Sequence, residues 1–445
     1  MSSLNREYDI QMYASKYGGD TYLFKLLTIL ICFLVLIYNY HKRQIVSSSS
    51  IWVLGYMLIM VIYPLYAVDV DYKNEQIIDY CALGGSFCFF IGNILGHRFR
   101  IRKRRLVQGG STCYLIPNFN VSMIAFWVTL FLSIICLLYL IGIEGISLIL
   151  QGISTSKHFA LHGDKDNSIY VFSIHLMVPC ILGMWISATN KWERRFRIFA
   201  LIVYILETVL FGFTRIFLIT ILSIIVIYEM RNLNRRKQTL YSFICVLVVM
   251  MVLVLMNFVR SLGLGKMNSF NQYLNLDYFF ESTDFGASYF WLDKLLDITP
   301  PYISPIVYLK PIFMFIPRSL WPTKPEPLSL QILQIIDPIR AASGYSTAGN
   351  SVIGEGYAIM GHVGLFLYPL IWGIICASLD RNFYERLLKG KDRSLKNVFY
   401  YIYAVFIVVS AQRGDWSQYM GIVCWFYFLP LYILSRVSFR IKQRN

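Results

Sequence analysis

The stretch "YLFKLLTILICFLVLIYNY" (residues 22–40), followed directly by "HKRQ" (41–44), decides what kind of protein this sequence forms. Apart from Lys25 its side chains are uncharged and mostly apolar, and a helix of about 20 such residues crosses a hydrocarbon core of about 30 Å. The cations that follow are typical of a loop that stays in the cytoplasm. The stretch therefore predicts a transmembrane helix together with its orientation.

The composition of the whole chain agrees with this interpretation. The chain has 445 residues, of which 57% are hydrophobic and only 15% charged. A soluble domain of this length needs more charge on its surface, so the composition favours a polytopic membrane protein. The net charge of +16 comes from cations in short loops between apolar runs, which is a topology signal. We therefore expect no nucleic-acid partner.

Further apolar runs of spanning length follow the first. Backbone polar groups inside a bilayer must be paired within their own segment, so each run is expected to be a helix. The fold class is therefore an all-α polytopic membrane protein with about 11 transmembrane helices (about 10–12). The predicted spans are residues 22–40, 50–68, 78–97, 121–142, 168–188, 197–213, 215–230, 240–259, 361–379, 397–412 and 419–436.

The charges of the loops alternate along the chain and predict which side each loop faces. Basic loops stay in the cytoplasm, so the C-terminus is expected inside and the stretch 260–360 outside. This divides the chain into an N-terminal bundle of about eight helices (1–259), one large loop (260–360) and a C-terminal bundle of about three helices (361–445). The basic segments are residues 41–44, 97–105, 191–197, 231–237, 380–396 and 436–444.

The large loop is predicted to be folded and functional. Its cations and carboxylates nearly balance, and it is too rich in aromatic residues and prolines for a disordered linker. Within it "PIVYLKPIFMFIP" (305–317) is apolar but too short to span. We expect this segment to lie along the membrane interface or to re-enter the membrane, with Trp321 as an anchor.

Four arginines are expected at the outer face, against the usual charge bias: Arg215, Arg260, Arg318 and Arg413. A cluster of cations at one membrane surface implies a compensating anion. Guanidinium matches phosphate oxygens bidentately and stays charged at any physiological pH. The set therefore predicts a diphosphate site, while the alternative that each arginine pairs with a loop carboxylate or a lipid headgroup stays open.

The second candidate motif is "GEGYAIMGHVG" (354–364), which leads into a predicted span. Glu355 and His362 are seven residues apart and would share a face if one helix ran through both. Either side chain is a candidate general base. The structural alternative is that the glycines allow close helix packing and that Glu355 pairs with an outer-face arginine. The glycine spacing matches no nucleotide-binding motif.

Other acidic residues are weaker candidates. "DVD" (69–71) resembles the acidic motif of some membrane glycosyltransferases, but it is also an ordinary solvated loop. Glu207 lies inside a predicted span, where carboxylates are often functional. The sequence contains no CxxC or HExxH pattern, so we expect neither a metal site nor a cofactor.

The two motifs together resemble a known family. "IPRSLWPTKPEP" (316–327), followed by "GEGYAIMGHVG", is similar to the Wzy-type O-antigen polymerases, which polymerise oligosaccharide repeat units. Arg215 also lies where that family often has an arginine. His362 departs from the family pattern. The matching residues are Ile316, Pro317, Arg318, Trp321, Pro322, Lys324, Pro325, Gly354, Glu355, Tyr357, Gly361 and Gly364.

This resemblance implies a GT-C-like enzyme of the bacterial inner membrane with a periplasmic active site. Its substrate is an undecaprenyl diphosphate-linked oligosaccharide, and its implied partners are membrane lipids and a chain-length regulator, without metal or nucleotide. Glu355, His362 and Arg318 are the expected catalytic residues. The expected residues for diphosphate and glycan are Arg215, Arg260, Arg318, Trp321, Lys324, Tyr357 and Arg413.

Two other functions remain open at this stage. An O-antigen ligase has a similar architecture and the same donor but transfers the glycan to the lipid A core. A flippase or secondary transporter needs a polar pathway at the bilayer midplane, for which the sequence offers little beyond Glu207.

Overall fold

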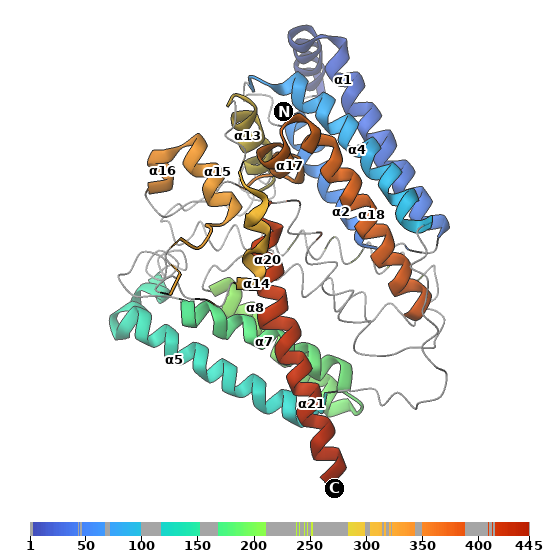
Figure 1. Ribbon diagram of the computed structural model, residues 1–445. Coiled ribbons are helices and arrows are strands. Elements are labelled where there is room, and N and C mark those ends of the chain that lie inside the picture. The colour runs from blue at the N-terminus through green and yellow to red at the C-terminus, as the bar shows by residue number, and fades with distance from the viewer. Residues whose placement is uncertain are drawn as a thin grey trace.

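The computed structural model of the chain is helical in every regular element that it describes, and Figure 1 shows two groups of long helices with shorter helices beside one end of the first group. The described residues are 3–42, 44, 47–66, 72–98, 117–151, 168–210, 237, 240, 244, 247, 251, 284–298, 303–313, 316, 320, 321, 323–342, 349–387, 408, 412 and 414–444.

The first group has one large hydrophobic core, in which Trp52 stacks between Tyr56 and Phe89. These helices are apolar around most of their circumference, so one face packs inward and the rest stays exposed, as in a lipid-facing bundle. Its members are α1 (Ser3–His41), α2 (Ser48–Met57), η1 (Leu58–Ile62), α3 (Tyr63–Tyr66), α4 (Glu75–Arg98) and α18 (His362–Leu387).

The second group surrounds a separate core that contains Phe126, Met177 and Tyr204. The last helical stretch begins between the two groups and continues into the second one without interruption (Figure 1). The members are α5 (Phe119–Gln151), α7 (Ser168–Ser187), α8 (Lys191–Leu210), α20 (Trp416–Ile422), η3 (Val423–Phe428) and α21 (Leu429–Arg444).

Six described helices are long and apolar enough to cross a membrane, so the prediction of a polytopic all-α protein is confirmed. The predicted span 168–188 is a helix with a shorter apolar stretch, and most of 197–213 lies in α8, which begins with a charged turn. The predicted spans 215–230, 240–259 and 397–412 lie almost wholly outside the described residues. The six are Thr21–His41, Ser48–Tyr66, Glu75–Arg98, Phe119–Tyr139, His362–Phe383 and Tyr419–Val437.

The packing of α4 against α18 is built on small residues. Gly92 lies against the backbone carbonyl of Leu370, and Gly373 lies against that of Phe89. A side chain at either glycine would overlap the opposing backbone. Small residues let helix backbones approach closely where lipid provides no hydrophobic drive for association.

Buried charged side chains also connect α4 with its neighbours α1 and α18. The Lys25 ammonium on α1 lies 2.6 Å from a Glu75 oxygen and 3.0 Å from an Asp79 oxygen on α4, and all three side chains are buried. At the other end of these helices, the Arg381 guanidinium donates to the carbonyl of His97 at 3.0 Å. The first group therefore has two distinct polar ends.

Among the shorter helices from the region 284–360, α13 (Asp284–Leu296) and α17 (Val352–Met360) lie near the end that contains Glu75, whereas α14 (Lys310–Phe313) lies beside α20 (Figure 1). The apolar segment that was expected to lie at or in the membrane forms two short turns, and the Trp425 indole donates to the Pro311 carbonyl at 2.8 Å. These helices are α13 (Asp284–Leu296), η2 (Pro305–Leu309), α14 (Lys310–Phe313), α15 (Leu328–Ile336), α16 (Pro338–Ala342) and α17 (Val352–Met360).

Candidate active site

The short helix α17 carries the first candidate residue. Ser351 is its N-cap, because the Ser351 hydroxyl accepts a hydrogen bond from the backbone N–H of Gly354 at 3.3 Å. Glu355 follows in the first turn, where a negative charge is favourable. Its side chain is nevertheless 0% exposed, so the helix start delivers a carboxyl group into the protein interior.

A tight turn from a distant part of the chain meets this carboxyl group. Gly414 has a φ of +86° and lies against the Asn350 backbone, and Asp415 follows with a φ of +59°. Both conformations are left-handed, which is unfavourable for a residue with a side chain. The turn directs the Asp415 backbone N–H at the Glu355 Oε1 atom, to which it donates a hydrogen bond.

The Asp415 side chain holds this turn in place. One carboxylate oxygen accepts from the Ser329 hydroxyl at 2.7 Å, and the other accepts from the Ser417 hydroxyl at 3.1 Å. Ser329 belongs to α15, so three segments that are remote in sequence converge here. Both oxygens of the Asp415 carboxylate therefore accept hydrogen bonds from neutral hydroxyl groups.

The environment of Glu355 is unusual for a carboxyl group. Its Oε2 atom is buried and has no hydrogen-bond partner among the described residues. Burial, followed by the nearby Asp415 charge, raises the pKa of Glu355 well above its usual range. The backbone N–H groups of Asp415 and Trp416 oppose this rise only in part. The result is a carboxyl group with a high proton affinity and one free oxygen.

Two tyrosine hydroxyl groups lie close to Glu355. Tyr308 of η2 and Tyr368 of α18 form a hydrogen bond with each other through these groups. Burial, and then the Glu355 charge, raises the pKa of Tyr308 above its ordinary value. The Tyr308 ring stacks on Trp416 with centroids 4.8 Å apart. The pair therefore supplies neutral hydroxyl groups beside the buried carboxyl.

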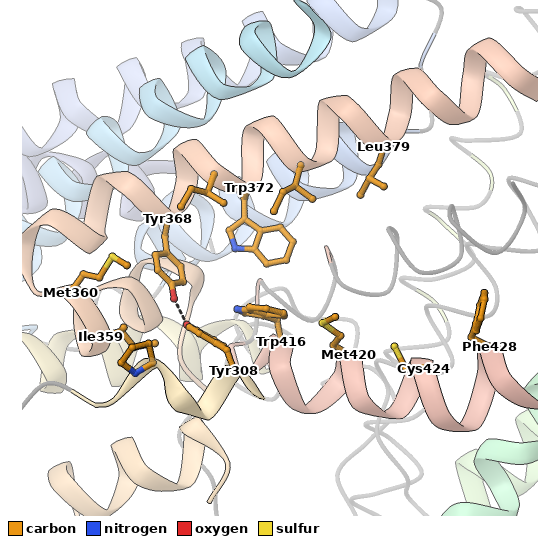
Figure 2. A pocket seen from close by; sticks show the side chains of 13 residues that line it. Tyr308, Ile359, Met360, Tyr368, Trp372, Leu379, Trp416, Met420, Cys424 and Phe428 are labelled. Atoms are coloured by element: carbon orange, nitrogen blue, oxygen red, sulfur yellow. Dashed lines mark hydrogen bonds between the residues drawn. The ribbon is translucent and has the colours of Figure 1, made fainter. Parts of the chain in front are cut away.

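An apolar cavity of about 760 Å³ opens at this tyrosine pair. Figure 2 shows that two rows of side chains face each other across it, one row from α18 and the other from α20 and η3. The lining residues are Pro305, Tyr308, Ile359, Met360, Tyr368, Ile371, Trp372, Ile375, Leu379, Trp416, Met420, Cys424 and Phe428.

The structure describes only some of the residues that the sequence predicted for the site. The four arginines of the predicted diphosphate site, Arg215, Arg260, Arg318 and Arg413, lie outside the described residues, as does "DVD" (69–71). Their proposed roles stay predictions.

Trp321 and Lys324 form a compact turn beside α14. The Trp321 ring packs edge-on against Phe313 with centroids 5.4 Å apart. The Lys324 ammonium donates to the Ile316 carbonyl at 2.9 Å. Both side chains are half-buried, and these contacts hold the turn together without a ligand.

His362 and Glu355 do not share a helix face. The chain turns at Gly361, which has a φ of +62°, so α17 ends before α18 begins at His362. His362 is exposed while Glu355 is buried, and the His362 ring lies 5.5 Å from that of the buried Tyr357. Residues seven apart share a face only within one continuous helix, and Gly361 interrupts the helix here.

The structural explanation for the glycines of this motif is confirmed. Gly356 and Gly364 lie backbone to backbone, and a side chain on either would overlap the other. The outer-face arginines that were the alternative partners of Glu355 lie outside the described residues, so this pairing stays a prediction. The glycines thus bring α17 against α18, and this packing positions Glu355.

Glu207 lies on α8, in the second group of helices. It is buried and accepts a hydrogen bond from the Ser133 hydroxyl of α5. In the part of the chain that the structure describes, no group of three or more His, Cys, Asp and Glu side chains is arranged to hold a metal ion.

Asp415, Tyr308 and Tyr368 were not singled out from the sequence. The "RGD" turn gave a usable signal, because a glycine next to an aspartate favours a left-handed turn. For the two tyrosines there was no such signal, since they are two of 32 in the chain.

A comparison with protein families gives one match over nearly the whole chain. The family model described as O-antigen polysaccharide polymerase Wzy matches residues 10–442. No curated protein and no solved structure gives a significant match.

Proposed function

Because the chain belongs to the O-antigen polysaccharide polymerase Wzy family, we propose that it elongates a glycan at the periplasmic face of the bacterial inner membrane. The growing chain is transferred from undecaprenyl diphosphate to the non-reducing end of an incoming lipid-linked repeat unit. The family makes the protein a polysaccharide-polymerising glycosyltransferase of the membrane. The direction of transfer, the donor and the membrane face belong to the proposal.

One observation carries the assignment of the active site. Glu355 is completely buried, is oriented by backbone amides, and keeps one oxygen without a partner among the described residues. An unpaired buried carboxyl oxygen is costly for stability and therefore points to a function. Its raised proton affinity suits a general base, which works best when its pKa is near the working pH.

The proposed reaction balances as a single displacement. The oxygen of the acceptor hydroxyl attacks the anomeric carbon of the donor sugar and forms the new glycosidic bond. The bond between that carbon and the diphosphate oxygen breaks, and its electron pair leaves with the diphosphate. Glu355 takes the hydroxyl proton. The donor itself supplies the driving force, so no nucleotide is consumed.

The leaving diphosphate needs cations, and the arginines supply them in this proposal. Arg413 is separated from Asp415 by a single residue, and Arg318 lies in the sequence between Ile316 and Trp321. Guanidinium groups aimed at the leaving oxygens stabilise charge that develops in the transition state. Arg215 and Arg260 complete the proposed set.

The remaining predicted residues are assigned to the glycan. The half-buried Trp321 offers part of its indole face, and Lys324 and Tyr357 lie in the two motifs that flank the proposed site. Apolar sugar faces stack on aromatic rings in the way that other apolar surfaces do. His362, exposed at the start of α18, is the second choice for a base.

The test is a lipopolysaccharide gel of a deletion strain that carries plasmid-borne variants. We expect the deletion to leave single repeat units on lipid A, and the wild-type gene to restore long chains. Arg318→Ala is expected to abolish long chains while the protein still reaches the membrane, and Arg318→Lys is expected to fail also if the diphosphate is held bidentately.

Two other outcomes would contradict the proposal. Lipid-linked polymer that accumulates without attachment to lipid A would indicate a ligase. Loss of export without loss of polymerisation in a purified assay would indicate a transporter.

A further inference from the structure

The cavity that opens at the tyrosine pair is elongated and follows two membrane-spanning helices. Its α18 wall extends from Tyr368 to Leu379, which is about 16 Å at about 1.5 Å per residue. The facing wall extends from Trp416 to Phe428. The cavity thus reaches through about half of a hydrocarbon core that is about 30 Å thick.

The two ends of the cavity differ in polarity. One end holds the hydroxyl groups of Tyr308 and Tyr368. These groups form a hydrogen bond with each other and lie near Glu355. The other end, between Leu379 and Phe428, is lined by apolar side chains. A ligand that matches both ends has a polar head and a long hydrocarbon tail.

The cavity also opens sideways. Ile375 is 38% exposed and Phe428 is 44% exposed, although both line it. Both residues belong to candidate membrane spans, so this side opening faces the surface that lipid covers. A lipid-anchored molecule reaches such a cavity from within the bilayer and need not leave it.

We propose that this cavity holds the isoprenoid chain of the donor substrate, with its diphosphate at the tyrosine end beside Glu355. This inference rests on the proposed function. Only one of the two lipid-linked substrates has its diphosphate at the reacting carbon, namely the donor. The acceptor reacts through its non-reducing sugar, so its own diphosphate lies a whole repeat unit away. A hydrocarbon cavity that ends at the reaction centre therefore fits the donor chain.

The test varies the two lipids separately in single-turnover assays of the purified protein. The donor is capped so that it cannot accept, and the acceptor has a phosphonate link so that it cannot donate. Each is prepared with an undecaprenyl chain and with a geranyl chain of two isoprene units. The variants are Ile375→Trp and Cys424→Trp, which fill the far part of the cavity. The matched control is Ile433→Trp, which lies on α21 outside the cavity and is 50% exposed.

We expect both filling variants to raise KM for the undecaprenyl donor by about tenfold or more, because part of the chain loses its apolar contact. The geranyl donor reaches only the tyrosine end, so its KM should stay unchanged. Acceptor chain length should not affect the variants differently from the wild type. Equal losses with both donors, no loss with either, or a loss that depends on the acceptor chain would overturn the inference.

A binding measurement separates failure of this inference from failure of the proposed function. A prenyl diphosphate with a benzophenone at the chain end is photo-crosslinked to the wild-type protein in lipid nanodiscs. We expect labelled peptides from 371–379 or 420–428, competition by undecaprenyl phosphate but not by phosphatidylglycerol, and loss of label in Ile375→Trp. This result without polymerisation would refute the function alone. Label confined to other helices, or competition by phospholipid, would refute the cavity assignment.

Discussion

At the scale of single residues, the site depends on a difference between two carboxyl groups in burial and in hydrogen bonding. Asp415 has hydroxyl donors for both oxygens, whereas Glu355 is completely buried and one of its oxygens has no partner within the described part of the chain. Burial, and then the nearby Asp415 charge, raises the pKa of Glu355. The high proton affinity suits Glu355 to receive a proton from a hydroxyl group.

Glu355→Gln is expected to lower the polymerisation rate by about 100-fold or more, because an amide cannot accept the proton. The variant should remain folded, since an amide of the same shape removes the cost of a buried charge. Glu326→Gln, the same change at a half-buried position of the large loop, serves as the control and should keep full activity. A fully active Glu355→Gln enzyme would refute the assignment of the base.

The pH dependence of the wild-type rate follows from the same residue. The ionised carboxylate accepts the proton, and the pKa of Glu355 is raised above the usual glutamate value of about 4.3. The rate should therefore fall as the pH drops through this raised pKa, well above the range of an ordinary glutamate. The measurement is kcat as a function of pH. A fall in kcat that begins only near the usual glutamate pKa would contradict this prediction.

Asp415→Asn tests the influence of the neighbouring charge. The Asp415 carboxylate raises the pKa of Glu355, so the neutral amide should move the acid limb of the rate profile to lower pH. A purely structural role would reduce the rate without moving the limb. Asp337→Asn, which changes an acid at the start of α16, is the control and should leave the profile in place.

At the scale of elements, the backbone N–H groups at the start of α2 are capped by a side chain that is distant in the sequence, whereas helix caps usually come from adjacent residues. The start of α2 is held by Asp380 of α18, which accepts from the backbone N–H and the hydroxyl of both Ser48 and Ser49. These four bonds are between 2.6 and 2.9 Å long, and all the side chains are buried. An N-terminus inside a protein needs such acceptors, because no water satisfies its N–H groups.

Asp380→Ala is expected to destabilise the protein by about 2–4 kcal/mol, because it leaves buried donors without an acceptor. The control is Glu193→Ala, which removes an exposed acceptor for the N–H groups at the start of α8 and should cost below about 1 kcal/mol. Thermal unfolding in detergent, followed by circular dichroism, measures both. Equal decreases in Tm for the two variants would show that a buried capping side chain stabilises the protein no more than an exposed one.

At the scale of the whole molecule, the two polar ends of the first helix group have different compositions. One end gathers the ends of α1, α4 and α18, where the rings of Tyr38 and His97 lie 5.4 Å apart next to Arg381. The opposite end contains Glu75, and α13 lies beside it, since Asp293 accepts a hydrogen bond from the Asn74 backbone N–H. This separation agrees with the charge bias of loops, although that bias was found from the sequence alone.

Labelling of engineered cysteines tests the proposed orientation. In a cysteine-free background, Leu320→Cys, at a side chain that is 79% exposed in the large loop, should react with an impermeant maleimide in intact spheroplasts. His41→Cys, at the exposed end of α1, should react only after permeabilisation. The reverse pattern would place the proposed site in the cytoplasm and remove the basis for a periplasmic polymerase.

The sequence by itself determined the class of protein and the positions of most described helices. A bilayer leaves no solvent for unpaired backbone groups, so every long apolar run must form a helix, and this is a local requirement. The motif that contains Glu355 was also recognisable, because its glycines and acid stand together. The condition that one helix runs through Glu355 and His362 is not met, because the backbone conformation of Gly361 ends α17 between the two residues.

Only the tertiary structure decided how the site is assembled. Asp415 meets Glu355 across 60 residues, Tyr308 meets Tyr368 across 60, and Ser48 meets Asp380 across 332. Helices in lipid associate through small residues and a few polar contacts, and such residues mark a packing face without showing which helix it meets. The sequence thus specifies which segments become helices, whereas packing alone specifies which side chains face each other.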